Sequence, residues 1–308
     1  MAITAPRTRA DFAGFLPPEM SAPIFERAAK ASVAMQLAQQ VPLGAEGKSI
    51  PVVTGRLSAG WVAEGAAKPA SEAALALKTM TPHKLATIAV VSAEVVRANP
   101  GNYMQILRNQ VGEAFAIAFD WAAFHDAGPT GVAGGGPFST WLDQTTTAVE
   151  IGSTTPAGGG IHGDFAAALA ALVSDGKRLT GWALDNELEP VLWSAVDLNG
   201  RPLYIDLPTD DTSGALARQG RLLGRPSYMG EIRDGTMILG YGGDWQQAAW
   251  GVVGGISYDV STEATVTING QLVSLFEHNL VAIRAEAEYG WLVNDVQSFC
   301  QLTDAVTP

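Results

Sequence analysis

The segment between residues 50 and 85 constrains the fold of this chain more than any other. It contains the run Trp61-Val62-Ala63-Glu64-Gly65-Ala66-Ala67-Lys68-Pro69-Ala70-Ser71 and then polar residues, and the apolar Ile88-Ala89-Val90-Val91-Ser92 follows it. Its weak alternation predicts two extended strands that project as a hairpin. An isolated hairpin is only marginally stable in water, so this arm needs another surface to lie on. The segment therefore indicates assembly rather than catalysis.

Composition excludes several classes of protein. With 308 residues and 47% hydrophobic residues, the chain is long enough for one or two domains with large cores. Its formal net charge of -12 argues against a dedicated nucleic-acid binder, which needs a basic face. The single cysteine, Cys300, excludes an intrachain disulfide and a Cys-based zinc site, and the four histidines lack ligand spacing. We therefore expect neither a metal nor a cofactor.

No targeting or membrane segment is visible in the sequence. Pro, Thr and Asp11 interrupt the N-terminus where a signal peptide needs a continuous apolar stretch. The apolar run from Ala114 to Phe124 contains Asp120 and is too short to span a membrane. The chain is expected to be soluble and intracellular when it is made, with no membrane partner.

Hydrophobic periodicity predicts two helices in the first half of the chain. The first begins at Ser21, carries Ile24, Ala28, Ala31, Met35 and Ala38 on one face, and ends at Pro42. The second is the longest of the chain. It runs from about Asn102 to Asp126, and its apolar face is formed by Met104, Leu107, Val111, Ala114, Phe115, Ala118 and Ala122.

The second half predicts shorter, mixed elements. Asp164 is the expected N-cap of a helix that buries Phe165, Ala168, Leu169, Leu172 and Val173 and ends near Gly176. A strand at 182–184 and a helix at 188–195 follow. Glycine turns separate expected strands at 236–240, 248–253 and 256–260. A long strand near the end has Val281, Ile283, Ala285, Ala287 and Tyr289 on one face and Ala282, Arg284, Glu286 and Glu288 on the other.

This order of elements resembles a tailed-phage major capsid protein of the Hong Kong 97 fold. The resemblance rests on the hairpin with Glu64 and Lys68-Pro69-x-Ser71, on the long helix, and on the strand Phe276-x-x-Asn279-x-x-x-Ile283-Arg284-x-Glu286. It covers nearly the whole chain and implies an α+β fold with five parts. These are the N-arm and first helix (1–49), the E-loop (50–85), the P-domain with its spine helix (86–163), an α/β A-domain (164–270), and the return strand of the P-domain with the C-terminus (271–308).

The resemblance implies a structural protein rather than an enzyme. Its copies would form hexamers and pentamers that close an icosahedral virion shell around double-stranded DNA, without sequence-specific binding. The resemblance also implies a portal, a separate scaffolding protein or none, and assembly in the host cytoplasm. Two alternatives stay open: an encapsulin-type nanocompartment with the same shell fold, and a soluble α/β enzyme with an unusual arm. Trp61, Glu64, Lys68 and Arg284 are the expected assembly contacts.

The resemblance also implies a candidate covalent crosslink between subunits. Matched motif by motif, the reacting lysine is Lys68, the asparagine is Asn279 and the assisting glutamate is Glu286. The free lysine amine would attack the amide carbon, the carboxylate would accept a proton, and ammonia would leave. Each residue has a structural alternative: Lys68 as a solvated lysine, Asn279 as a brace of the strand, and Glu286 as an ion-pair partner of Arg284.

Overall fold

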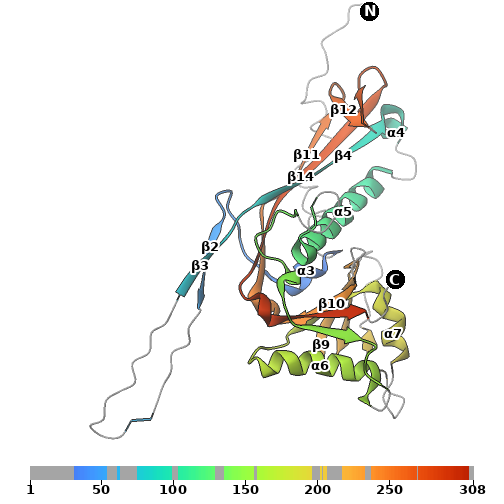
Figure 1. Ribbon diagram of the computed structural model, residues 1–308. Coiled ribbons are helices and arrows are strands. Elements are labelled where there is room, and N and C mark those ends of the chain that lie inside the picture. The colour runs from blue at the N-terminus through green and yellow to red at the C-terminus, as the bar shows by residue number, and fades with distance from the viewer. Residues whose placement is uncertain are drawn as a thin grey trace, which may run out of the picture.

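The computed structural model describes residues 31–53, 61–62, 75–98, 103–128, 135–155, 158–195, 202, 204–206, 217–232, 237–268 and 270–304. Two sheets with helices on their faces form the body, and a hairpin arm projects from it (Figure 1). The four-stranded sheet has the order β1 (Gln39–Gln40), β11 (Ala248–Ser261), β14 (Leu280–Val293), β4 (His83–Ser92). The seven-stranded sheet has the order β5 (Ala148–Ile151), β15 (Phe299–Asp304), β10 (Ile238–Gly243), β6 (Gly181–Asp185), β9 (Arg225–Gly230), β8 (Arg218–Leu222), β7 (Tyr204–Asp206).

Two hairpins and several helices complete the described fold. The hairpins pair β2 (Lys48–Val53) with β3 (Leu75–Met80), and β12 (Thr265–Ile268) with β13 (Gln271–Ser274). The α-helices are α3 (Val33–Leu37), α4 (Ala93–Ala98), α5 (Tyr103–His125), α6 (Gly160–Ser174) and α7 (Glu189–Ser194). Short 3-10 helices are η3 (Leu142–Gln144), η5 (Asn186–Leu188), η7 (Trp245–Gln247) and η8 (Val296–Ser298).

The long helix and the long return strand are confirmed. Helix α5 lies along the four-stranded sheet, whose central strands β11 and β14 are antiparallel (Figure 1). On β14, Ala285, Ala287 and Tyr289 are buried, whereas Arg284 is exposed and Glu286 and Glu288 are half-buried. This alternation follows from the two-residue period of a strand with one face against the core.

The pair of strands predicted at 248–253 and 256–260 is in fact one strand, β11. Its pairing with β14 continues on both sides of a register shift between Val253 and Ser257. Gly254 and Gly255 lie within this shift and have φ angles of 69° and 87°, so they form a bulge rather than a turn. The strand expected at 236–240 corresponds to β10, which begins two residues later, at Ile238, and extends to Gly243.

The first helix, predicted from Ser21 to Pro42, ends earlier than predicted. Residues 21–30 lie outside the described chain, and α3 ends at Leu37 rather than near Pro42. Ala38 is extended, and β1 pairs in parallel with β11. The Val41 amide then donates to the Trp250 carbonyl at 2.8 Å. Pairing with β11 therefore overrides the helical spacing of the side chains.

In α6 the predicted C-terminus is confirmed and the predicted N-cap is wrong. Gly176 has φ 71°, and its amide donates to the Val173 carbonyl at 3.0 Å. The helix begins five residues earlier than expected, at Gly160, so Asp164 lies inside it. Its buried carboxylate instead accepts hydrogen bonds from the Gly152 and Thr154 amides at 2.8 and 3.0 Å. Val173, expected to be buried, is 57% exposed.

The predicted hairpin arm is present at its base, and its strands point away from the body (Figure 1). Register pairs run from Lys48 with Met80 to Val53 with Leu75. At the base, the Lys78 ammonium donates to the carbonyls of Val293 and Asn294 at 3.2 and 2.7 Å, at the end of β14. These bonds connect the direction of the arm to the four-stranded sheet.

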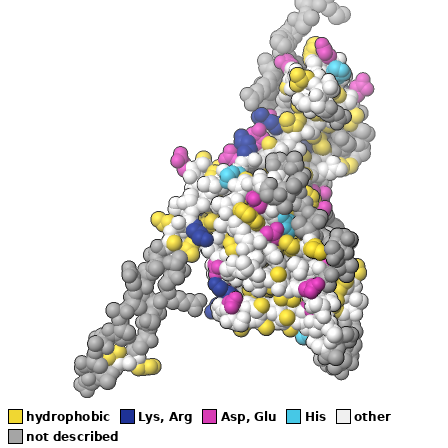
Figure 2. All heavy atoms as spheres, in the orientation of Figure 1, with side chains coloured by type: hydrophobic (Ala, Val, Ile, Leu, Met, Phe, Trp, Pro, Cys, Tyr) yellow, Lys and Arg dark blue, Asp and Glu magenta, His cyan; other side chains and the backbone are white. Residues whose placement is uncertain are grey.

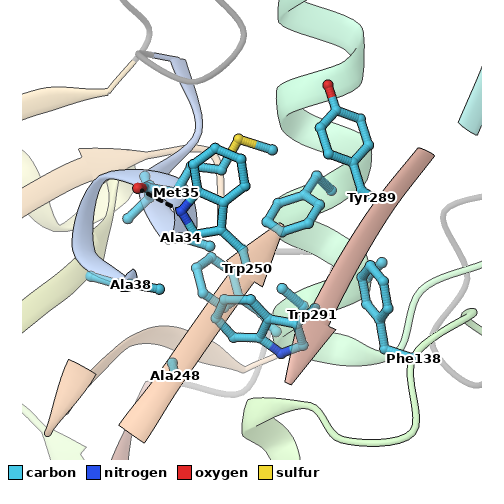
Figure 3. Close-up of a cluster of buried hydrophobic side chains, with 14 of the residues drawn as sticks. Ala34, Met35, Ala38, Phe138, Ala248, Trp250, Tyr289 and Trp291 are labelled. Carbon is cyan, nitrogen blue, oxygen red and sulfur yellow. Dashed lines mark hydrogen bonds between the residues drawn. The ribbon is translucent and has the colours of Figure 1, made fainter. Parts of the chain in front are cut away.

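An aromatic cluster forms the core between α5 and the four-stranded sheet. The Phe119 ring centroid lies 5.5 to 6.4 Å from the rings of Phe138, Trp250, Tyr289 and Trp291. Figure 3 shows Trp250 beside α3, where its indole nitrogen donates to the Met35 carbonyl at 3.2 Å. The cluster therefore joins α3, α5, β11 and β14 into one body. A second core lies beneath the seven-stranded sheet, where Phe165 meets Trp182 edge to face at 5.2 Å.

Candidate assembly surfaces

Asn279 lies in the turn that leads into β14, and its side chain is exposed. Its φ angle is 51°, a left-handed conformation that asparagine tolerates better than most residues. Its carbonyl accepts from the Ala93 amide at 3.0 Å, which connects the turn to the start of α4. Through its backbone, Asn279 therefore links this turn to α4. The side-chain amide makes no hydrogen bond to the described residues and faces solvent.

Glu286 lies in the middle of β14, on the face of the sheet away from α5. Its carboxylate is 3.4 Å from the Lys84 ammonium and 3.3 Å from Nε of Arg284. Arg284 also donates to the Asp259 carboxylate at 2.6 Å, and the pKa of Arg284 is raised by that bond and by the charge of Glu286. In Figure 2, charged side chains of both signs lie together over this sheet.

Within one chain, Asn279 and Glu286 lie too far apart to react together. Six residue steps along β14 separate Leu280, next to Asn279, from Glu286, a span of roughly 20 Å at about 3.3 Å per residue. Lys68 and Glu64 lie outside the described residues. A reaction that used Asn279 and Glu286 together would therefore need these two residues from different copies.

The expected arm contact Trp61 is fully exposed. Its side chain has a relative exposure of 107%, and that of Val62 is 38%. Indole is the largest apolar side chain, and leaving it in water forgoes a large burial free energy. Arg284, the other expected contact among the described residues, is half exposed and already paired.

A groove of about 700 Å³ runs between α5 and β4, along the outer edge of the four-stranded sheet. It was not predicted, because its walls come from segments that are distant in sequence. Small and apolar side chains from α5, β4, β14 and the segment after Gly135 line it: Leu85, Ala114, Phe115, Ile117, Ala118, Phe119, Trp121, Pro137, Phe138 and Tyr289. Lys84 and His83 lie at the same groove. Two donors in its walls, Nε1 of Trp121 and the hydroxyl of Tyr289, have no hydrogen-bond partner among the described residues.

A buried polar network joins the end of α5 to the seven-stranded sheet. The network centres on His125, the last residue of α5. In the structure its Nδ1 lies 2.8 Å from the Asp143 carboxylate and its Nε2 lies 2.8 Å from the Ile232 carbonyl. The Tyr241 hydroxyl donates to the same carboxylate, and burial together with the Asp143 charge raises the Tyr241 pKa well above its usual value. Only Asp143 of these side chains is partly exposed, and the network connects α5 to the seven-stranded sheet.

Among the described residues, no group of three or more His, Cys, Asp or Glu side chains has the geometry to hold a metal ion. In the same part of the chain, none of the helices combines the length and the apolar character that crossing a bilayer requires.

Comparison with known proteins gives consistent matches over almost the whole chain. The model of the Phage capsid family matches residues 13–304. The chain is 42% identical over 301 residues to "Probable major capsid protein gp17" of Mycobacterium phage D29, covering 96% of this chain and 92% of the relative. It is 41% identical over 305 residues to the protein of the same name from Mycobacterium phage L5, covering 95% and 90%.

Solved structures share the fold at lower identity. A structure from Gordonia phage Cozz has a TM-score of 0.67 at 24% identity and covers 90% of this chain and 87% of that one. A structure from Mycobacterium phage Adephagia has a TM-score of 0.66 at 18% identity and covers 99% and 100%. A third, titled "Capsid of empty GTA particle computed with C5 symmetry", has a TM-score of 0.61 at 17% identity and covers 90% of each chain.

Proposed function

This chain belongs to the phage capsid family as a major capsid protein, and we propose that its copies assemble as hexamers and pentamers into the icosahedral shell around the double-stranded DNA of a tailed phage. The observation that carries the proposal is the 42% identity to a major capsid protein over 96% of the chain. The projecting arm and its exposed Trp61 support it, because both need a neighbouring surface. No specific observation favours the encapsulin-type shell.

The proposal extends to the details of the Hong Kong 97 fold. In this division the N-arm and first helix take residues 1–49 and the E-loop takes residues 50–85. The P-domain takes residues 86–163 and 271–308 apart from β5 and β15, which belong to the seven-stranded sheet, and the A-domain takes most of 164–270. We assign β11 to the P-domain as well, because it pairs with β14 on both sides of the bulge. The β12–β13 hairpin, which lies at the far end of the same sheet, goes with it (Figure 1).

The same proposal includes the other components of the particle. A portal and a separate scaffolding protein act with this subunit, assembly takes place in the host cytoplasm, and the chain ends in the virion capsid. The net charge of -12 supports a container that holds DNA without binding it tightly, because a basic lining would neutralise many phosphates.

Electron microscopy of the purified, full-length protein tests the shell. Closed particles of uniform diameter are expected. A chain that stays monomeric and compact at high concentration would contradict the proposal and favour the enzyme alternative. Particles isolated from infected cells should also contain DNA, whereas an encapsulin-type shell would contain protein cargo.

The crosslink between Lys68 and Asn279 is the finer part of the proposal. The exposed side chain of Asn279 supports it, and the separation from Glu286 requires the glutamate of another copy. Denaturing gel electrophoresis of assembled particles should give a ladder of covalent oligomers, which Lys68→Arg should abolish while it keeps the positive charge. A single band at monomer mass in wild-type particles would exclude the crosslink and leave the shell proposal intact.

A further inference from the structure

We propose that His125, Asp143 and Tyr241 form a pH-sensitive junction network, which holds the end of α5 to the seven-stranded sheet while an additional proton lies between His125 and Asp143. The network is complete when this proton is bound, and it weakens when the proton is lost at alkaline pH. Such a network acts within a single chain, whether or not the chain assembles.

The first ring nitrogen of His125 must carry a hydrogen. Its Nε2 lies 2.8 Å from the carbonyl oxygen of Ile232, which can only accept. Ile232 is held from its other side, because its amide donates to the Asp185 carboxylate at 2.8 Å. Its side chain is also completely buried. Nε2 is therefore the donor in this contact.

The second ring nitrogen also faces an acceptor. Nδ1 lies 2.8 Å from one oxygen of the Asp143 carboxylate, and the other oxygen accepts the hydroxyl hydrogen of Tyr241. The hydroxyl also lies 3.2 Å from Nδ1, but its single hydrogen goes to the closer Asp143 oxygen. A neutral imidazole would therefore place the lone pair of Nδ1 against those of a carboxylate, so a proton must lie between them.

The donors around Asp143 favour an imidazolium beside a carboxylate. Burial and the Asp143 charge raise the Tyr241 pKa well above its usual value, so this phenol remains a donor at alkaline pH. The Gln301 side chain adds a hydrogen bond to the same carboxylate at 3.4 Å. Hydrogen bonds to a carboxylate favour its charged form. The additional proton therefore belongs on the ring of His125.

The ring is enclosed by the elements that pack around it. The His125 side chain is fully buried and the Asp143 side chain is 22% exposed, so water does not replace a lost hydrogen bond at Nδ1. The other acidic groups on the neighbouring segments are Asp126, Asp185 and Glu231. Asp126 and Asp185 accept hydrogen bonds from backbone amides, and Glu231 is exposed.

The junction network lies where the two main parts of the fold meet. His125 is the last residue of α5, which packs on the four-stranded sheet. Tyr241 and Gln301 belong to β10 and β15 of the seven-stranded sheet, and Gln301 also donates to the Asp143 carbonyl at 3.2 Å. One proton therefore affects the connection between the two sheets.

The sign of the pH effect follows from proton uptake. Above about pH 6.5, the ordinary pKa of histidine, the folded chain holds one proton that the unfolded chain has lost. The contribution of the network to stability is therefore fully present below about pH 6.5 and is lost as the pH rises, until the folded chain also releases the proton.

Asp143→Asn tests the additional proton, because its amide nitrogen can donate to a neutral Nδ1 while its amide oxygen still accepts from Tyr241. Urea unfolding of unassembled subunits is compared between about pH 6 and pH 9. The unfolding equilibrium constant of wild type should rise relative to that of Asp143→Asn by up to about tenfold per pH unit. The titration of Asp120 is common to both proteins and cancels in this comparison. Parallel curves overturn the proposal.

Tyr241→Phe is the matched control. It removes a hydroxyl group from the same network but leaves the proton between His125 and Asp143. It should therefore lower the urea midpoint at every pH and keep the pH dependence of wild type. If Tyr241→Phe also lost this pH dependence, the additional proton would not be its cause and the proposal would be overturned.

A second measurement needs no variant and decides the question if Asp143→Asn does not fold. Nitrogen-15 NMR of the histidine side chains in the wild-type subunit shows which ring nitrogens carry a hydrogen, and the exposed His162 and His278 supply reference signals. At about pH 7.5, where an ordinary histidine is neutral, both nitrogens of His125 should be protonated. A His125 ring with one bare nitrogen at this pH overturns the proposal.

Discussion

The buried carboxyl of Asp120 gives the protein a pH-dependent stability that can be isolated by one substitution. Asp120 lies on α5 and holds the start of α3: the Ser32 hydroxyl donates to it at 2.5 Å, the Val33 amide at 2.7 Å and the Ala34 amide at 3.1 Å. Burial raises the pKa of Asp120 from 3.8 to about 7, although these three hydrogen bonds lower it. Asp120→Asn keeps the shape and removes the titration.

The sign of the effect follows from proton uptake. Between the unfolded pKa of 3.8 and the folded pKa of about 7, the native state holds a proton that the unfolded chain has lost. The contribution of Asp120 to the free energy of unfolding is therefore fully present below pH 4 and is lost as the pH rises through 7. At about 1.4 kcal/mol per pKa unit, a shift of roughly three units gives a loss of up to about 4 kcal/mol.

Urea unfolding of unassembled subunits at pH 4 to 8, followed by tryptophan fluorescence, measures this directly. The stability advantage of wild type over Asp120→Asn should shrink steadily as the pH rises. Asp295→Asn is the control, and its stability difference from wild type should stay constant over pH 4 to 8, because a carboxyl with a lowered pKa loses its contribution only below that range. Burial raises the pKa of Asp295, but hydrogen bonds from Lys177 and Ser298 outweigh this and leave it below its usual value. Parallel stability curves for wild type and Asp120→Asn would refute the reasoning.

Three further substitutions have defined outcomes. Phe119→Ala removes the ring at the centre of the aromatic cluster and should cost about 3–5 kcal/mol, measured as a lower urea midpoint of the unassembled subunit; an unchanged midpoint would contradict the packing. Gly176→Ala should lower the free energy of unfolding by about 1 kcal/mol, because φ is 71° at this uncrowded position. Gly44→Ala, at a position that is equally uncrowded but has no positive φ, should leave the free energy of unfolding unchanged. Arg284→Ala breaks the exposed pair with Asp259 and should change the stability of the subunit by less than about 1 kcal/mol, so a larger loss would refute the assignment of a weak surface pair.

The elements that could be predicted are those whose sequence pattern and tertiary environment agree. Helix α5 and strand β14 carry long, regular apolar faces, and both faces meet the same aromatic cluster. Their limits were therefore predicted to within a few residues. Helix α3 shows the opposite case, because residues beyond Leu37 keep helical spacing but pair with β11. A backbone partner more than two hundred residues away cannot be deduced from local periodicity.

Special backbone positions were harder to predict than side-chain faces. A pair of glycines is compatible with a turn or a bulge, and only the continued pairing with β14 identifies Gly254-Gly255 as a bulge. Asp164 has the composition of an N-cap, but Gly158 to Gly160 allow the helix to begin earlier, which leaves the carboxylate free to bind the preceding loop. In both cases the residue type was informative and the conformation was decided by contacts along the rest of the chain.

In the candidate sites, too, contacts between residues close in sequence could be predicted, whereas contacts between distant segments could not. The ion pair of Glu286 with Arg284 was predicted as an alternative, because residues two apart on a strand share a face. The contacts of Asp120 with Ser32 and of His125 with Ile232 were not, because each joins segments about ninety or more residues apart. The groove between α5 and β4 has the same origin, since its two walls belong to separate predicted elements.

Packing at the base of the β2–β3 arm fixes the direction in which the arm leaves the body, and this favours its proposed role in assembly. Side chains at Gly251 or Gly290 would collide with Leu43 and approach Met80, so both glycines are needed for Met80 to lie against the sheet. Met80 is completely buried there, and Lys78 holds the carbonyls at the end of β14. A flexible arm would lose much conformational freedom on docking, which weakens association, whereas an arm with a fixed base loses less. Loosening the base, for instance by Lys78→Ala, should therefore weaken assembly even though Lys78 lies at the base of the arm.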